Sequence, residues 1–324
     1  ENINTGVQTA IDTRYPDGGS SMQGAALYAS HTFEVSDKLI INDGIRFSQV
    51  GLQAKFVDQT FFPFPFNQIQ QNHLALNGNL GLIYMPTQKL RVSLNGSTAF
   101  RAPNVDDLTK VFESVPGAVI VPNPTLKAEY AYNTDVSIAK TLSNFVKVEL
   151  TGFYTLLKNA MVRRNFTLNG LSEIMYDGEM SQVQAIQNAA NANVYGFQTG
   201  IEIDLGKGFI FSSDFNYQKG EEEMENGEKS PLRHATPWFG TTRFSYSNDK
   251  FNAQLYANYS GEVAFEDMPE SEIAKPFLYA IDLNGNPYSP SWFVLNIKTS
   301  YKFKENLLFS SGIENITDLR YRPY

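Results

Sequence analysis

Alternating apolar and polar residues run through almost the whole chain, and no other feature restricts its fold as strongly. From Leu90 to Arg101, every second residue is apolar or small, and the residues between them are mostly polar. Successive side chains of a β-strand point to opposite faces, so this segment predicts a strand with one apolar and one polar face. Similar strands come in pairs around short turns near Ser36-Asp37, Thr87-Gln88, Leu142-Ser143, Gly206-Lys207, Asn248-Asp249 and Lys304-Glu305. The pattern predicts an all-β, antiparallel chain of about twelve strands. Only from Ala26 to Glu34 are the two faces hard to assign.

Long irregular segments separate the predicted hairpins, and all of them fall on the side opposite the short turns. They cover roughly residues 1–22, 51–71, 102–125, 161–190, 219–231 and 263–289. Loops above about 15 residues are uncommon in compact soluble domains. Many of the predicted strands have about 10–15 residues, and a tilted strand needs about 9–11 to cross a hydrocarbon layer. Short turns on one side and long loops on the other are typical of an up-and-down transmembrane β-barrel.

Charges of both signs lie on the polar faces of the predicted strands, which suits a water-filled lumen. They are Arg46, Lys147, Glu149, Glu202, Asp204, Arg243 and Lys298. No apolar run is long enough for a membrane-spanning helix. The net charge of -8 does not favour a nucleic-acid partner, and the absence of cysteine excludes disulfides and thiolate metal sites. The alternative fold, a soluble β-sandwich or β-solenoid, predicts shorter strands and long loops at both ends.

Two sequence boxes resemble those of the TonB-dependent receptors of Gram-negative outer membranes. Phe100-Arg101-Ala102-Pro103-Asn104 is followed by Asn123-Pro124-Thr125-Leu126-Lys127-Ala128-Glu129. The family often has a Phe-Arg-Ala-Pro box at the top of one strand and a box close to Asn-Pro-Asn-Leu-Lys-Pro-Glu at the start of the next. Thr125 and Ala128 depart from the second box but keep its spacing. The end of the chain, from Gly312 to Pro323, looks like the penultimate strand of that family.

The resemblance implies a barrel of about 22 strands around an N-terminal plug domain with a TonB box. Residues 1–324 are therefore interpreted as the C-terminal portion of such a barrel, without the plug domain and the final strand. The implied location is the outer membrane, and the implied partners are its lipid, TonB acting through the plug, and an extracellular small-molecule ligand. A ferric siderophore is the first expectation for this ligand, followed by haem or cobalamin and then an oligosaccharide. Two alternatives stay open: a passive porin or surface adhesin on the same barrel, and a soluble β-rich carbohydrate-binding protein.

Two groups of residues in the long loops are candidates for ligand binding. Arg101 and Asn104 lie where a predicted strand enters a loop, and the alternative is that they hold the loop root through hydrogen bonds. The second group is an aromatic run interrupted by prolines, which deny it a place in a central strand. Such rings can hold a planar or apolar ligand, and the alternative is packing of one loop on another. The run contains Phe61, Phe62, Phe64 and Phe66.

Three histidines occur, and two of them, His73 and His234, are predicted near the outer ends of strands. There they could ligate haem iron, although they could equally be ordinary surface residues. Haem receptors that resemble this family typically have a histidine between the two boxes, and residues 104–122 contain none. The acidic segments 221–228 and 266–272 are predicted to be solvated loops. No catalytic motif is present, so the sequence predicts no enzyme, no metal site and no cofactor.

Overall fold

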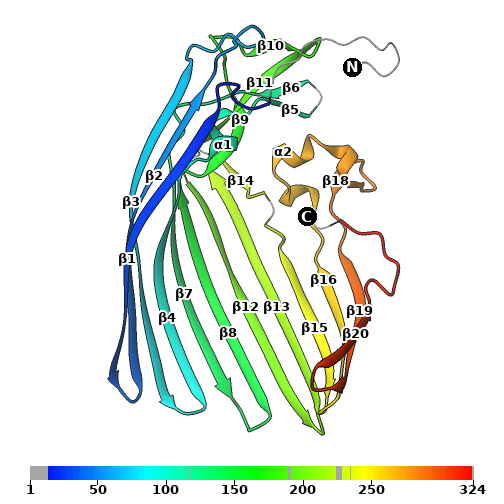
Figure 1. Ribbon diagram of the computed structural model, residues 1–324. Helices are drawn as coiled ribbons and strands as arrows, with labels where there is room; N and C mark the ends of the chain where they lie inside the picture. The colour runs from blue at the N-terminus through cyan, green and yellow to red at the C-terminus, as the bar shows by residue number, and fades with distance from the viewer. Residues whose placement is uncertain (1–13, 116, 189–190, 224–227, 234, 323–324) are drawn as a thin grey trace.

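The computed structural model describes residues 14–322, except 116, 189–190, 224–227 and 234. One curved antiparallel sheet dominates it, and twelve of its thirteen strands follow one another in chain order (Figure 1). These are β1 (Ser20–Ser36), β2 (Leu39–Lys55), β3 (Gln68–Thr87), β4 (Leu90–Arg101), β7 (Glu129–Thr141), β8 (Val146–Lys158), β12 (Asn191–Gly206), β13 (Phe209–Glu223), β15 (Trp238–Ser247), β16 (Phe251–Ser260), β19 (Trp292–Lys304) and β20 (Leu307–Ile313). The remaining strand, β14 (Lys229–Pro231), pairs with β13. The predicted class, strand number and all six predicted turns are confirmed.

Strand pairing follows the alternation of the sequence, including the segment whose faces were hard to assign. Residues 26–34 lie inside β1 and pair with β2 in continuous register. The turns are tight, and the one between β12 and β13 needs three consecutive residues with positive φ, Gly206, Lys207 and Gly208. A side chain on Gly208 would collide with the carbonyl oxygen of Ser247. Glycine tolerates this backbone conformation without steric cost, which explains its place in this turn.

The apolar rows of the sheet are uncovered, whereas its concave face is polar. Leu76 on β3 and Leu150 on β8 are 64% and 49% exposed, and similar side chains continue along the neighbouring strands. On the concave face, Lys147 contacts Glu202 at 2.8 Å and Asn95 donates to Asp135 at 3.1 Å. A sandwich would pack the apolar rows against a second sheet. The exposure of these rows contradicts that alternative and agrees with a barrel wall.

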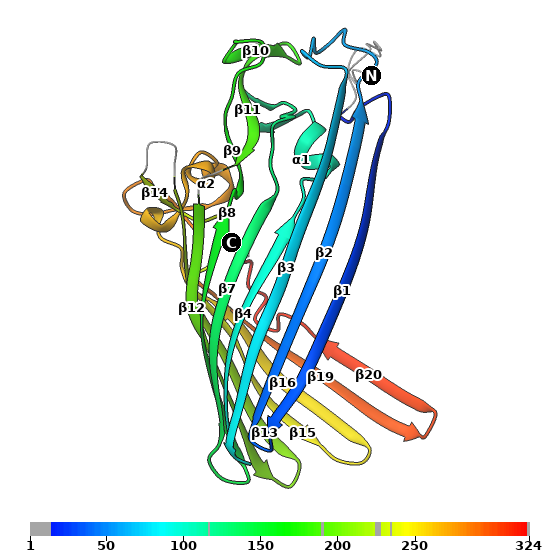
Figure 2. The same ribbon diagram turned by 90° about the vertical axis from the view of Figure 1, so that its left-hand side faces the viewer.

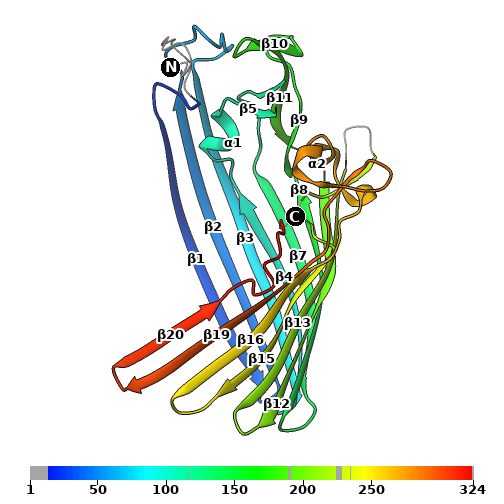
Figure 3. The same ribbon diagram turned by 90° about the vertical axis from the view of Figure 1, so that its right-hand side faces the viewer.

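The sheet is a partial barrel that does not close. β1 and β20 are its two ends, and within the described residues they do not pair with each other. Figures 2 and 3 show the two strands diverging at opposite margins of the curved sheet. The resemblance expected a strand from Gly312 to Pro323, but β20 already ends at Ile313. The chain turns there because Asn315 has positive φ and its side chain accepts a hydrogen bond from the Leu319 backbone.

A second, smaller sheet covers one end of the barrel wall, on the side of the long loops (Figure 1). It consists of β5 (Phe112–Val115), β6 (Ala118–Ile120), β9 (Met161–Asn165), β10 (Glu173–Tyr176) and β11 (Glu179–Asn188), beside the short helix α1 (Val105–Thr109). Its core includes Val119 and Val183, which are fully buried. We call this sheet together with α1 the loop layer. The sequence predicted these segments only as irregular loops.

The loop between β16 and β19 forms a separate small structure at the same end. It contains η1 (Phe265–Asp267), α2 (Glu270–Ile273), η2 (Pro276–Leu278) and the two-stranded pair β17 (Ala280–Ile281) and β18 (Pro287–Tyr288). Within the described ranges, no helix is both long and apolar enough to span a membrane.

Candidate functional site

Arg101, at the end of β4, links both ends of the segment that carries α1, β5 and β6. Its guanidinium donates to the Asp107 carboxylate at 2.8 and 3.0 Å and to Glu129 at 2.8 Å. Asp107 belongs to α1, and Glu129 is the first residue of β7. A planar guanidinium suits such paired contacts with carboxylates. Arg101 therefore holds the loop layer to the barrel wall.

Asn104 begins α1 and closes the same network. Its side-chain oxygen accepts a hydrogen bond from the Asp107 backbone at 2.9 Å, and the Asp107 carboxylate accepts one from the Asn104 backbone at 3.0 Å. This reciprocal capping box satisfies backbone groups that a helix start leaves unpaired. The structure thus places Arg101 and Asn104 in the loop root, as the structural alternative proposes. Ligand binding by either residue stays a prediction.

The second box is built into the loop layer in the same way. Asn123 is buried, and its amide donates to the Ile186 carbonyl of β11 at 2.8 Å. Its side-chain oxygen accepts from the backbone and the hydroxyl of Thr125 at 3.1 and 2.7 Å. Thr125, where this chain departs from the family box, therefore still contributes hydrogen bonds to Asn123. Both boxes join β-strands to the loops that follow or precede them.

The aromatic run lies in the core of the loop layer. Phe62 and Phe64 are 6% and 7% exposed, and their rings stack at 5.6 Å. Phe64 also stacks on Phe66 at 5.5 Å. Only Phe61 is largely exposed. The rings of Phe62 and Phe64 are thus occupied by packing between loops, and of this run Phe61 is the ring most open to a ligand.

The two histidines that the structure describes lie apart from each other. His73 is on the concave face of β3, below the loop layer, and one ring nitrogen is 2.7 Å from the Gln71 side-chain oxygen. His31 pairs with Asp43 at 3.1 Å on the opposite face, close to the short turn between β1 and β2. His234 lies outside the described residues. In the part of the chain that the structure describes, no three His, Asp or Glu side chains are placed to hold a metal ion.

A buried carboxylate joins the other loops, and the sequence prediction was wrong here. Glu272, expected in a solvated segment, is 2% exposed. It accepts hydrogen bonds from Lys275 at 2.9 Å and Tyr279 at 2.6 Å and forms an ion pair with Arg233. Burial raises the pKa of Glu272, but these hydrogen bonds and the charge of Arg233 lower it more, so the net pKa lies below its usual value. Nothing in the local sequence distinguishes Glu272 from the exposed Glu270.

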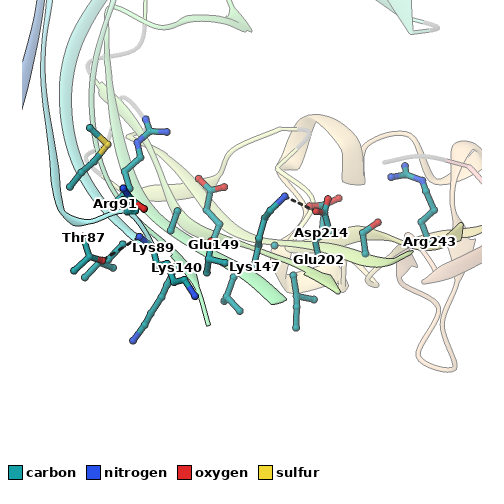
Figure 4. A pocket seen from close by; sticks show the side chains of 18 residues that line it. Thr87, Lys89, Arg91, Lys140, Lys147, Glu149, Glu202, Asp214 and Arg243 are labelled. Carbon is teal, nitrogen blue, oxygen red and sulfur yellow. Dashed lines mark hydrogen bonds and ion pairs between the residues drawn. The ribbon is translucent and has the colours of Figure 1, made fainter. Parts of the chain in front are cut away.

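A polar hollow of about 420 Å³ lies on the concave face, close to the short turns and far from the loop layer (Figure 4). Arg91, Lys147, Glu149, Glu202, Asp214 and Arg243 contribute charges of both signs to its lining. Lys147 and Glu202 form an ion pair across neighbouring strands at 2.8 Å. The sequence predicted that several of these charged residues lie on the polar face of the strands. It did not predict that they converge in one place.

The geometry so far is that of a barrel wall with inward-folded loops, and sequence comparison agrees. The chain matches the family described as TonB dependent receptor-like, beta-barrel, over residues 2–316. The chain belongs to this family. The resemblance seen in the two boxes is thereby confirmed, and with it the location in the outer membrane.

Curated relatives are distant and considerably longer. Hemoglobin-haptoglobin utilization protein B of Neisseria meningitidis serogroup C is 23% identical over 313 residues, which cover 88% of this chain and 37% of the relative. The iron-regulated outer membrane virulence protein of Vibrio cholerae serotype O1 is 22% identical over 232 residues, covering 70% and 34%. The chain therefore spans about a third of the length of these curated relatives.

Solved structures show the same fold. The copper transporter OprC superposes with a TM-score of 0.68 at 12% identity, over 94% of this chain and 42% of OprC. The ferric yersiniabactin uptake receptor FyuA from Yersinia pestis gives a TM-score of 0.62 at 18% identity, with the same two coverages. At these identities the likeness concerns the barrel fold alone and not the ligand.

Proposed function

We propose that residues 1–324 form the C-terminal portion of an outer-membrane receptor barrel that takes up a scarce iron-containing ligand. The observation that carries this proposal is the loop layer, which is anchored by Arg101 and Asn123 at the mouth of a polar concave wall. A structured layer at the outer end of a rigid barrel can hold binding residues in fixed positions. Lipid on the outside of the wall suits the exposed apolar rows, as in other transmembrane barrels.

The lower part of the concave wall suits a plug domain as partner, with TonB acting through that plug. The hollow near the short turns carries Arg91 and Arg243 together with Glu149 and Asp214. Charges of both signs can form hydrogen bonds and ion pairs with a folded polar surface, whereas one sign would favour a small ion of opposite charge. Release of such a plug would then open the path for the ligand.

A ferric siderophore is our first candidate ligand and haem is the second. Two observations favour haem as the second candidate. Curated relatives include a hemoglobin-haptoglobin utilization protein. His73 lies on the concave face below the loop layer, where an imidazole can serve as an iron ligand. We propose no catalytic activity, since transport needs none.

Growth on defined iron sources tests this function. A strain without the gene for the intact receptor is grown with a ferric siderophore or haemin as the only iron source, or with limiting cobalamin, which contains no iron, as a comparison. We expect a growth defect on one iron source, restored by the gene only in cells with TonB. A defect that is independent of TonB would favour a passive porin. Normal growth on every source, together with reduced surface attachment, would favour an adhesin.

A further inference from the structure

Three cationic side chains surround one aromatic ring in the loop layer. Lys110 Nζ lies 4.8 Å from the centroid of the Phe112 ring, Arg163 Cζ lies 5.5 Å from it and Arg14 Cζ 5.6 Å. Phe112 begins β5, Lys110 follows α1, Arg163 is on β9, and Arg14 precedes β1. Figures 1 and 3 show α1, β5 and β9 grouped at the mouth of the barrel wall. We call these four residues the Phe112 cluster.

Two of the three cations in the Phe112 cluster have no ion pair within the described part of the chain. Lys110 forms an ion pair with Asp106 at 3.2 Å. Among the described residues, neither Arg14 nor Arg163 has a carboxylate within ion-pair distance. Arg163 is half-buried, and burial, followed by the charge of Arg233, lowers its pKa, although the charge of Glu272 opposes this in part. A guanidinium that is partly removed from water, with more positive than negative charge around it, is unfavourable, and a bound anion would relieve it.

The geometry of the cluster also limits the kind of anion. An aromatic ring attracts each cation through its quadrupole but cannot cancel the repulsion among three like charges. Two guanidinium groups from different segments offer planar donor pairs, which match the planar oxygen pair of a carboxylate. The exposed Tyr15, whose ring lies 5.8 Å from Lys110 Nζ, adds an aromatic wall beside the charges.

We infer that the Phe112 cluster binds the carboxylate groups of an anionic iron ligand at the mouth of the barrel. Both haem, through its propionates, and a ferric carboxylate chelate offer this chemistry. The inference rests on the proposed function of iron uptake and specifies its ligand as carboxylate-bearing. An uncharged chelate, in contrast, gains nothing from Arg14 and Arg163.

Binding to the intact receptor purified in detergent tests the inference, with haemin, ferric citrate and an uncharged ferric trihydroxamate as probes. In the double variant Arg14→Gln/Arg163→Gln, we expect the Kd of the carboxylate probe that binds to rise by about tenfold or more, the usual effect of losing a charged hydrogen bond. Arg163→Lys keeps the positive charge and should lose less affinity for the carboxylate probe. The matched control is Arg46→Gln, because Arg46 also lies over a ring, that of Tyr28, but on the barrel wall. It should leave the Kd unchanged.

The outcomes separate the inference from the proposed function. An effect on haemin alone identifies the propionates as the recognised groups, and an effect on ferric citrate alone identifies a carboxylate chelate. Unchanged carboxylate binding in the double variant would overturn the inference and leave the uptake function intact, as would a wild-type receptor that binds only the trihydroxamate. A parallel loss of carboxylate and trihydroxamate binding in the double variant would show a structural role and also overturn it. A wild-type receptor that binds none of the probes, in a strain whose growth does not depend on it, would overturn both.

Discussion

Residues that mark the family in the sequence serve the architecture in the structure. Arg101 and Asn104 connect β4, α1 and β7, and Asn123 connects the second box to β11. Their polar atoms are engaged with other parts of the loop layer. A motif residue at a loop root can therefore position a binding surface without contacting the ligand.

Replacing Arg101 should loosen the loop root. In Arg101→Gln the contacts with Asp107 and Glu129 are lost, which should reduce the local stability of residues 102–128 by roughly 1–2 kcal/mol, since the guanidinium is half-exposed. Hydrogen exchange of this segment in the purified receptor measures the effect. Arg91→Gln, on the same strand and the same face, serves as the control. Equal exchange in both variants would contradict the anchoring role.

Replacing Glu272 should release the loop between β16 and β19. Glu272→Gln leaves the nearly buried Lys275 without its counter-charge, which should cost roughly 3 kcal/mol of local stability. Protease cleavage within residues 261–291 measures it, and Glu270→Gln is the exposed control. Cleavage at the wild-type rate would contradict a role of the buried ion pairs.

The same carboxylate makes this loop sensitive to acid. Because the folded pKa of Glu272 is lowered from 4.5, its contribution is fully present above that value and is lost as the pH falls through the lower folded pKa. Hydrogen exchange of residues 261–291 in the wild type should therefore accelerate as the pH falls below about 4.5, after correction for intrinsic rates. In Glu272→Gln this acceleration should be absent. A wild-type loop whose corrected exchange is constant down to pH 3 would contradict the assignment.

The secondary-structure elements of the loop layer depend on tertiary contacts for their existence. α1 has only five residues, too few to be stable alone, and combines a capping box with one fully buried leucine. Leu108 packs against Leu52 and Ala54 of β2. The helix thus forms because the barrel wall provides its hydrophobic surface.

Truncation of this leucine should detach α1 while the barrel wall persists. Leu108 is 0% exposed, so Leu108→Ala removes buried contacts and should cost about 2–4 kcal/mol. Faster hydrogen exchange is expected in residues 102–112 and not in β7 or β8. The control is Leu283→Ala, because Leu283 is fully exposed. A uniform acceleration over the whole sheet would instead show that α1 is part of one cooperative unit with the wall.

The sheet as a unit has two chemically different faces and, within the described part of the chain, two free edges. Its concave face holds ion pairs and amides, and its convex face carries exposed leucine, valine and aromatic side chains. Such a surface is unstable in water but suits a bilayer, where the paired backbone of a barrel wall is fully satisfied. Among the described strands, β1 and β20 each have an unpaired edge, and such edges invite pairing with further strands.

A charge on the convex face should therefore destabilise the barrel far more than one on the concave face. Leu94 points outward from β4, and the neighbouring Ser93 points inward. Leu94→Arg should cost about 2–4 kcal/mol in lipid, whereas Ser93→Arg should be nearly neutral. Urea unfolding of the intact receptor in vesicles measures both. A similar cost for the two variants would contradict the contact of this face with lipid.

The local sequence pattern was sufficient to predict the strands and turns of the barrel wall. Period-two alternation and short turn residues act between neighbours in the chain, so the strands, their faces and all six turns could be predicted from segments such as Leu90–Arg101. The two sequence boxes indicated the protein family. None of this requires knowledge of which distant segments meet, because consecutive strands of the sheet pair in chain order.

The loop layer and the candidate site depend instead on long-range contacts. β6 pairs in parallel with β11 more than 60 residues later, Arg14 and Arg163 meet at the Phe112 ring, and the buried Glu272 contacts Arg233 and Tyr279. Such contacts leave no periodic signature, since each segment is short and its partner could lie anywhere in the chain. Burial and the position of counter-charges therefore followed from the three-dimensional arrangement, because both depend on which surfaces exclude water.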